Sequence, residues 1–331
     1  MSIIPIRDYL VYLLVRSLVC IIQILSMRQC RRIASWTASL AFHFDHRHRN
    51  VALENLERAF PNQYSPKQLH QFVWNIYYHF AVMIIEIAHI PRKLHGSNYR
   101  DFIKLTGIGP VIRSSFRGDP VIMLTGHFGN WEMAGYMLGV WGFQSQAVAR
   151  PLDNPYLDRF LRSFREKTGQ SLIPKKGGMA MIEDALENSG DIVCLVADQD
   201  AGRHGIFVDF FGTPASTHKA IALLALQHNA TIMIGGARRL GQRFQYEVCV
   251  SDIIPPESVA GEKDEIHALT QRFTHSLERM IRTAPEQYLW LHRRWKTKPG
   301  ARRRRKNRRD RNNRTSETHW NKTNSPASSS L

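Results

Sequence analysis

The sequence predicts an α/β fold: a mixed, largely parallel sheet with helices on both faces, preceded by an N-terminal membrane-associated helix. Three observations support this prediction. Apolar runs of strand length, at residues 121–124 and 191–197, end in polar loops, as buried parallel strands do. A helix start at Ser65-Pro66 precedes a broad apolar stripe. Residues 9–27 are almost continuously apolar.

The apolar segment 9–27 has about the ~20-residue length that a bilayer-spanning helix needs. Arg16 and Gln23 interrupt it, so whether it spans the bilayer or lies in the interface stays open, and a buried amphipathic helix is the alternative. Three arginines follow the segment at once: Arg28, Arg31 and Arg32. This positive charge places the C-terminal side, and with it the body of the protein, in the cytoplasm.

The remaining elements divide the chain into an anchor (1–30), a main domain (31–298) and a tail (299–331). Residues 31–60 read as helical, and the helix that begins at Ser65 is expected to end at Pro91. Further expected helices are 156–167, 179–188, 217–228 and 262–282, and further expected strands are 144–150, 231–238 and 244–250.

The charge of the chain is concentrated near its end. The formal net charge is +17. Residues 293–314 carry thirteen bases and one acid, which leaves the rest of the chain only about +5. We expect the tail to be disordered and able to bind anionic lipid or nucleic acid through its arginines. None of the four cysteines forms a C-x-x-C pair, which indicates reduced thiols and no zinc site.

The run 121–136 predicts a strand, a tight loop and a helix, with His127 in the loop and Glu132 in the first helical turn. On one continuous helix, residues five apart point to different sides. The two side chains can meet only if the chain turns at Gly126 and Gly129. A histidine held by a carboxylate could then act as a base. Capping and helix-dipole roles are the alternative for this pair.

Polar residues follow the other predicted strands as well. Asp198 and Gln199 stand at the end of the strand 191–197, where parallel sheets collect their sites. Asp198 either caps the turn or orders an acceptor pocket. No third ligand lies at motif spacing from His127 and Glu132, so we expect no metal.

Five separated segments carry a resemblance to a known family. Residues 126–132 (GHFGNWE) resemble the His-x4-acid motif of glycerolipid acyltransferases, and in particular the late lipid A acyltransferases of the lauroyl and myristoyl type. Matching signatures are RHRNVALENLERAFP from Arg47, ARPLDNPYLDRFLRSFREKTG from Ala149, VADQDAGRHGIFVDFFGTPA from Val196 and PEQYLWLHRRWK from Pro285, so the resemblance covers roughly residues 47–298. Agreement at several places in order is more specific than one motif.

The resemblance implies acyl transfer from an acyl-carrier-protein thioester to a hydroxyl of a lipid A precursor, at the bacterial inner membrane. His127 would deprotonate the hydroxyl, and Glu132 would orient His127. Arg165, or backbone amides near Gly126, would stabilise the oxyanion. Further substrate-binding candidates are Arg150, Asn130, Asp198 and Gln199. No cofactor is implied beyond the thioester co-substrate.

Three alternatives stay open. The first is the same chemistry on another membrane acceptor, such as a lysophospholipid or glycolipid. The second is a non-catalytic, membrane-tethered nucleic-acid binder that uses the basic tail. The third is a metal hydrolase that uses His127 and Glu132. The sequence determines neither the acyl chain length nor the oligomeric state.

Overall fold

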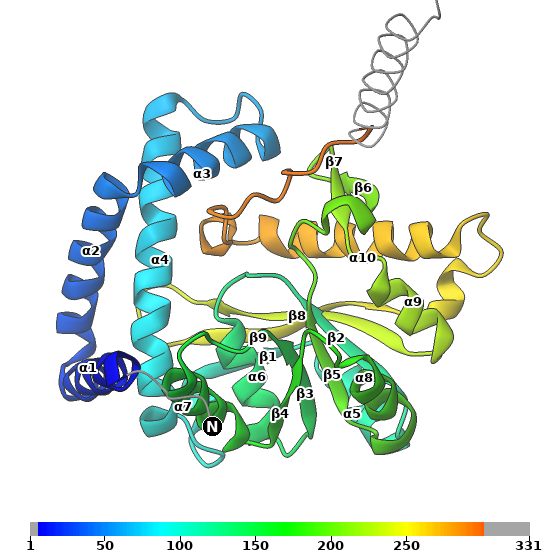
Figure 1. The fold of residues 1–331 in the computed structure, drawn as a ribbon, viewed down its shortest axis with the longest axis horizontal. Helices are drawn as coiled ribbons and strands as arrows, with labels where there is room; N and C mark the ends of the chain where they lie inside the picture. Colours follow the sequence, from blue (N-terminus) through cyan, green and yellow to red (C-terminus); the bar gives the residue numbers. More distant parts are fainter. Residues whose placement is uncertain (1–5, 301–331) are drawn as a thin grey trace, which may run out of the picture.

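The computed structural model describes residues 6–300, which build a seven-stranded sheet flanked by helices (Figure 1). The strand order is β1-β9-β8-β2-β5-β3-β4. These strands are β1 (Ile103–Thr106), β2 (Val121–Thr125), β3 (Ser145–Ala149), β4 (Gln170–Pro174), β5 (Ile192–Val196), β8 (Thr231–Arg239) and β9 (Tyr246–Ile254). The Arg-rich tail predicted from the sequence lies outside the described residues.

The strand directions make the sheet mixed. β2 pairs in parallel with both β5 and β8, and β3 pairs in parallel with β5 and β4. β9 runs antiparallel to β8, and β1 runs parallel to β9. The two strands at one edge therefore oppose the other five, and the predicted mixed, largely parallel sheet is confirmed.

The sheet opens between β3 and β5. The chain leaves β3 toward β4 and leaves β5 toward β8, so the connections diverge at this pair of strands. The β3–β5 pairing stops at Ala147 and Cys194, although the two strands continue to Ala149 and Val196. A crevice at the carboxyl ends of diverging strands is where open α/β sheets bind ligands.

Helices cover both faces of the sheet. On one face, Val111 of α5 and Leu138 of α6 pack with side chains of β2 and β5. On the other face, Ile182 of α8, Ile221 of α9 and Phe273 of α10 belong to a second, larger apolar core. The helices are α5 (Gly109–Arg117), α6 (Trp131–Val140), α7 (Pro155–Glu166), α8 (Met179–Asp184), α9 (Ala220–Gln227) and α10 (Glu265–Arg282).

Four N-terminal helices stand beside the sheet domain (Figure 1). They are α1 (Ile6–Ile24), α2 (Met27–Phe44), α3 (His46–Ala59) and α4 (Pro66–Lys93). Ser26 and Ser65 form capping boxes at the starts of α2 and α4. The helix predicted over 31–60 is divided at Asp45, whose side chain accepts from His48 N and caps α3. α4 also continues to Lys93, because Pro91 lies in its last turn, where the helix is ending anyway.

The apolar N-terminal segment forms α1, which lies against α4 and α7. Tyr9 and Tyr12 pack on Tyr156 of α7, with ring centroids 5.2 and 5.8 Å apart, and Arg16 lies over the ring of Phe160. Among the described residues, α4 is the helix whose length and composition would suit a membrane span, but 56% of its apolar window is buried inside the protein. α4 therefore packs as a core helix.

Smaller elements complete the fold. The hairpin β6 (Ile206–Phe210) and β7 (Thr213–Thr217) packs on α10. The closing segment after α10 crosses back to the sheet, where Asn55 of α3 donates to the carbonyls of Trp290 and His292. Short 3₁₀ turns are η1 (Tyr99–Asp101), η3 (Gly202–His204), η4 (Pro256–Val259) and η5 (Pro285–Gln287), and a π-helical turn, η2 (Ala185–Ser189), follows α8.

A buried polar network joins α4 to the sheet. Arg239 of β8 donates to Glu86 at 2.9 Å and contacts His79 Nδ1 at 3.2 Å. Burial, together with the charge of Arg239, lowers the pKa of His79 to about 3. The neutral ring therefore accepts from Arg239 at Nδ1 and donates from Nε2 to Gly129 O at 3.2 Å. Tyr246 also donates to Glu86. This network supports the loop after β2 from behind.

We predict that Glu86→Ala lowers the free energy of unfolding by ~3–5 kcal/mol, because it leaves the buried Arg239 without a counter-charge. Chemical denaturation measures the change. Asp153→Ala, which removes the exposed ion pair with Arg150, is the matched control and should have no measurable effect. The double variant Glu86→Leu/Arg239→Met should recover much of the loss. Equal stability of Glu86→Ala and wild type would show that the pair is solvated.

Candidate active site

His127 lies in the loop between β2 and α6, at the carboxyl end of the central strand. The loop needs glycine at position 129, where φ is +60° and an added Cβ would lie 2.0 Å from Ala237 O. The amide of Asn130 then donates to Ala237 O, and its side chain accepts from Met133 N, which starts α6. The strand, tight loop and helix predicted from the sequence are confirmed.

Asp198 holds His127 through two hydrogen bonds. Its Oδ1 accepts from His127 Nδ1 at 2.8 Å, and its Oδ2 accepts from the His127 amide at 2.8 Å. Because an ionised carboxylate can only accept, Nδ1 carries the proton and Nε2 keeps its lone pair. The Asp198 side chain is completely buried, whereas that of His127 is 19% exposed. Asp198 can therefore act on a substrate only through His127.

The two groups shift each other's pKa. Burial would lower the pKa of His127, but the charge of Asp198 and its hydrogen bond outweigh burial and raise that pKa above 6.5. Burial would likewise raise the pKa of Asp198, but His127 and the hydrogen bonds it donates hold it well below 3.8. The pair is thus an ionised carboxylate with a histidine of increased basicity.

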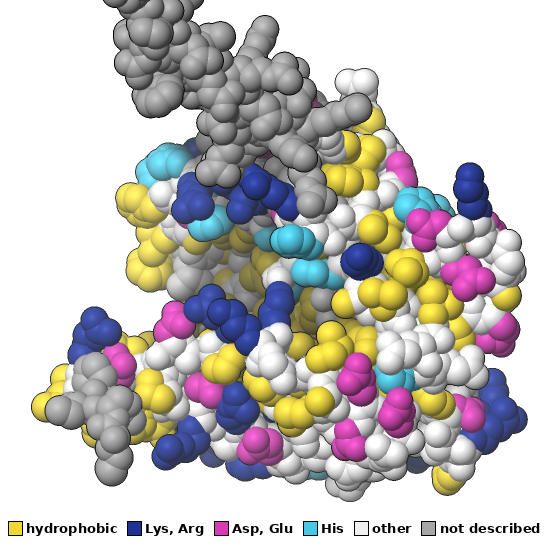
Figure 2. Space-filling model, turned by 45° about the vertical axis from the view of Figure 1, so that its right-hand side comes forward, with side chains coloured by type: hydrophobic (Ala, Val, Ile, Leu, Met, Phe, Trp, Pro, Cys, Tyr) yellow, Lys and Arg dark blue, Asp and Glu magenta, His cyan; other side chains and the backbone are white. Residues whose placement is uncertain are grey.

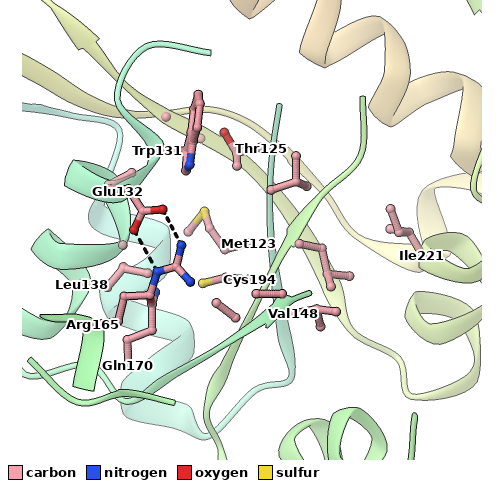
Figure 3. A pocket seen from close by; sticks show the side chains of 18 of the residues that line it. Met123, Thr125, Trp131, Glu132, Leu138, Val148, Arg165, Gln170, Cys194 and Ile221 are labelled. Atoms are coloured by element: carbon pink, nitrogen blue, oxygen red, sulfur yellow. Dashed lines mark hydrogen bonds and ion pairs between the residues drawn. The ribbon is translucent and has the colours of Figure 1, made fainter. Parts of the chain in front are cut away.

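The carboxylate that was expected to orient His127 has a different partner. Glu132 accepts two hydrogen bonds from Arg165 of α7, at 2.9 Å from Nε and 2.5 Å from Nη2 (Figure 3). The prediction that Glu132 orients His127 is wrong for this structure, and Asp198 takes that place. The physical reason lies in the helix: Glu132 is in the first turn of α6 and reaches α7, which the sequence spacing could not reveal.

The backbone amides that were expected to stabilise an oxyanion donate to other groups of the protein. The amides of residues 127–130 all donate within the protein: to Asp198 Oδ2, Gly126 O, Gln287 O and Ala237 O. These four amides are therefore occupied, and the expectation that amides of this loop stabilise an oxyanion does not hold for them. The Nη1 atom of Arg165 makes no hydrogen bond within the described residues 6–300. The Arg165 side chain lines the adjoining cavity, so Nη1 is the donor that remains for an oxyanion.

The other sequence candidates are spread over different environments. Asn130 is fully buried and donates to Tyr246, so it caps α6 and does not face a substrate. Gln199 is exposed and lines the cavity. Arg150 lines the cavity rim and pairs with Asp153, and both side chains are mostly exposed. Only His127, Glu132, Arg165, Gln199 and Arg150 of the predicted set border the cavity.

The cavity has a volume of about 470 Å³ and begins beside His127. Most of its walls are apolar. Figure 3 shows Met123, Leu138 and Cys194 next to Arg165, with Val148 and Ile221 farther across the sheet. Figure 2 shows a hollow in this face of the molecule, with hydrophobic side chains inside and Lys, Arg and His around its rim. A site of this shape suits a long apolar chain with a polar end.

Several site residues escaped the sequence analysis. The ring of Trp131 lies edge-on to His127, with centroids 5.1 Å apart. His292 Nε2 contacts Asp198 O at 2.9 Å, and Arg294 donates to Ser216 O, so the closing segment supports the strand ends. These three residues lie inside the segments that resemble the acyltransferase family, and this position was the only indication of their role in the sequence. Lys175 and His218 also line the cavity.

Chemically, the arrangement offers a base, a cation and an apolar cavity in one place. His127 Nε2 can take a proton from a hydroxyl, and Arg165 can stabilise negative charge on an oxygen. No group of three His, Cys, Asp or Glu side chains among the described residues is placed to hold a metal ion. The geometry supports transfer of an apolar acyl group to a hydroxyl.

Comparison with known proteins agrees with this chemistry. The family model described as bacterial lipid A biosynthesis acyltransferase matches residues 4–297. The chain is 28% identical over 272 residues to the lipid A biosynthesis lauroyltransferase of Escherichia coli K12, covering 81% of this chain and 85% of that protein. It is 27% identical over 267 residues to the palmitoleoyltransferase of the same organism, covering 79% and 83%.

A more distant relative has another acceptor in its name. The phosphatidylinositol mannoside acyltransferase of Mycobacterium tuberculosis is 29% identical over 148 residues, which cover 44% of this chain and 43% of that protein. The match across nearly the whole chain, together with a histidine base at an apolar cavity, leads to one assignment. This chain belongs to the bacterial lipid A biosynthesis acyltransferase family.

Proposed function

We propose that this protein moves a fatty acyl chain from an acyl-carrier-protein thioester to a hydroxyl of a lipid A precursor. The observation that carries the proposal is the His127–Asp198 pair at the mouth of the apolar cavity, in a chain of this family. Mass spectrometry of lipid A from cells with and without the gene tests it. Loss of one acyl chain in its absence is the expected result, and an unchanged lipid A would contradict it.

The mechanism follows from the geometry. His127 Nε2 removes the proton of the acceptor hydroxyl, while Asp198 keeps the proton on Nδ1 and stabilises the imidazolium that forms. The alkoxide attacks the thioester carbonyl and forms a C–O bond. Arg165 Nη1 stabilises the resulting oxyanion. Collapse of the intermediate breaks the C–S bond, and His127 returns its proton to the leaving thiolate. No covalent enzyme intermediate is needed.

Glu132 has a positioning role in this proposal. Its two hydrogen bonds hold the Arg165 guanidinium in one plane, with Nη1 left for the substrate. The apolar branch of the cavity beneath α5 and α6, lined by Val111, Leu138 and Trp141, receives the acyl chain. No metal or redox cofactor takes part in the proposed steps.

Another acceptor is the second candidate, and one observation favours it. The relative named phosphatidylinositol mannoside acyltransferase matches part of the chain, so the same chemistry could serve a different membrane glycolipid. Assays with purified protein on a lipid A precursor and on lysophospholipid or glycolipid acceptors distinguish the candidates. The non-catalytic nucleic-acid binder is disfavoured by the family match.

We also propose that α1 lies in the cytoplasmic interface of the inner membrane. Its outer surface is apolar and exposed, with Leu14 60% and Ile24 81% accessible. α1 rests flat on α7 through Tyr9 and Tyr12, an orientation that suits an interfacial helix more than a spanning one. This arrangement would bring the cavity mouth close to a lipid acceptor.

The first prediction concerns the base. His127→Ala should lower kcat by ~10²- to 10⁴-fold, because it removes the proton acceptor. In the wild type, kcat/KM should rise with pH through a pKa above 6.5, since the neutral imidazole is the active form and Asp198 raises its pKa. Asp198→Asn should shift this rise in kcat/KM to lower pH and should also lower kcat. Steady-state kinetics across pH measure both, with circular dichroism as the folding control.

Glu132→Gln is the matched test for the carboxylate of the motif. It should leave unchanged the pH at which kcat/KM rises, because Glu132 does not contact His127. If Glu132→Gln moved the profile and Asp198→Asn did not, the assignment of the two carboxylates would be reversed.

The second prediction concerns the arginine. Arg165→Gln and Glu132→Gln should each lower kcat by about 10- to 100-fold, the loss expected for one charge-assisted interaction with the transition state. Their effects should be far from additive, since the residues act as a unit. Arg162→Gln, which breaks a neighbouring ion pair with Asp158 on the same helix, is the control. A similar loss in that control would show a general effect on α7.

The third prediction concerns the membrane. The double variant Leu14→Glu/Leu18→Glu places charge on the exposed face of α1 and should shift the protein from the membrane to the soluble fraction after fractionation. Leu223→Glu changes an exposed leucine on α9 and should leave the distribution unchanged. Wild-type protein that is fully soluble without detergent would rule out the membrane assignment.

A further inference from the structure

The cavity beside His127 extends onto the second face of the sheet. Successive side chains of a strand alternate between faces, so Cys194 and Leu195 of β5 point to opposite sides. Both line the cavity. Because hydrogen-bonded strands leave no passage through a sheet, the cavity must pass where the β3–β5 pairing stops, beyond Ala147 and Cys194. The cavity therefore has a second branch.

The walls of this second branch come from helices that play no part in the chemistry derived above. Ile182 of α8 and Ile221 and Leu224 of α9 line it, opposite Val148 of β3. These side chains belong to the larger apolar core, whereas Leu138 and Cys194 of the first branch pack in a separate cluster. The second branch is thus lined mainly by apolar side chains of these two helices.

Two basic residues stand on the rim of the second branch. Lys175 and His218 line it, Lys175 is exposed, and neither side chain forms an ion pair within residues 6–300. The amide of Lys175 donates to Ala149 O at 3.1 Å, which fixes the turn after β4 against the end of β3. Partial burial, with Lys175 and Arg294 nearby, lowers the pKa of His218. A lysine without an ion-pair partner at the end of an apolar passage favours an anionic group there, and the neutral ring of His218 can donate a hydrogen bond to such a group.

The position of the branch indicates which substrate uses it. α8 and α9 lie on the side of the sheet domain away from α1 and α2 (Figure 1). The exposed apolar residues of α1 and α2, such as Leu14 and Trp36, face the other way and suit a lipid surface. A lipid acceptor would enter from that side, which leaves the α8–α9 side to the water-soluble donor.

We propose that the branch between α8 and α9 binds the phosphopantetheine arm of the acyl donor, with Lys175 and His218 contacting its phosphate. The acyl chain then occupies the branch under α6, and the thioester lies at the gap between β3 and β5, beside His127. The proposal rests on the thioester-dependent function argued above. It assigns a binding site to residues that the reaction itself does not use.

The experiment compares three donors with the full-length protein in detergent. These are an acyl-carrier-protein thioester, an acyl-coenzyme A and an acyl-N-acetylcysteamine, which keeps the thioester but lacks the phosphate. Lys175→Glu should raise KM for the first two donors by about tenfold or more, as loss of a charge-assisted contact predicts. KM for the third donor, KM for the lipid acceptor and kcat should stay unchanged. Carrier protein and coenzyme A share the arm, so a rise for carrier protein alone would indicate a protein-docking patch and overturn the proposal.

Two further variants sharpen the test. Ala220→Trp fills the branch at the start of α9 and should raise KM for the two long-armed donors only. Lys263→Glu makes the same charge change at an exposed position elsewhere and should leave all three donors unaffected. If Lys175→Glu raises KM for the acceptor instead, Lys175 serves the acceptor and the proposal fails. If the wild type uses none of the three thioesters, the proposed function itself fails.

Discussion

The double hydrogen bond from His127 to Asp198 is the interaction on which the site depends. It exists because β2 and β5 are parallel neighbours in register, with Thr125 opposite Val196. The chain continues two residues past the end of each strand, to His127 and Asp198, so the two residues meet at the same edge of the sheet. The burial of Asp198 makes this contact strong, since a carboxylate removed from water needs both donors. The strand order therefore sets the chemistry.

Two carboxylates near the cavity have different partners and hence different roles. Asp198 faces a histidine and raises its basicity, whereas Glu132 faces an arginine and fixes its orientation. Behind them, Glu86 and Arg239 support the loop through His79 and Gly129. Each of these three carboxylates has a basic partner, which is how a buried site keeps its geometry. Lys175, which forms no ion pair within residues 6–300, and His218 stand on the rim of the cavity.

The gap between β3 and β5 connects the two surfaces that substrates would approach. Diverging connections open the sheet at this pair, and the cavity passes through the opening. One side carries α1 with its exposed apolar residues, and the other carries α8 and α9 with Lys175 and His218 on the rim. A transferase with one lipid substrate and one water-soluble substrate needs access from two sides. The cavity of this fold borders both of these sides.

The sequence by itself determined the mixed, largely parallel α/β fold, the loop with His127 and the family. Apolar runs, caps and glycines act locally, so the pattern of residues 121–136 was enough to predict strand, turn and helix. Only the tertiary structure decided which carboxylate holds His127, because Asp198 is 71 positions away and its contact depends on β5 inserting next to β2. The pairing of Glu132 with Arg165 and the second branch of the cavity were likewise decided only by the tertiary structure. Sequence spacing reports neighbours along one element, whereas pairing between elements depends on the order of the strands.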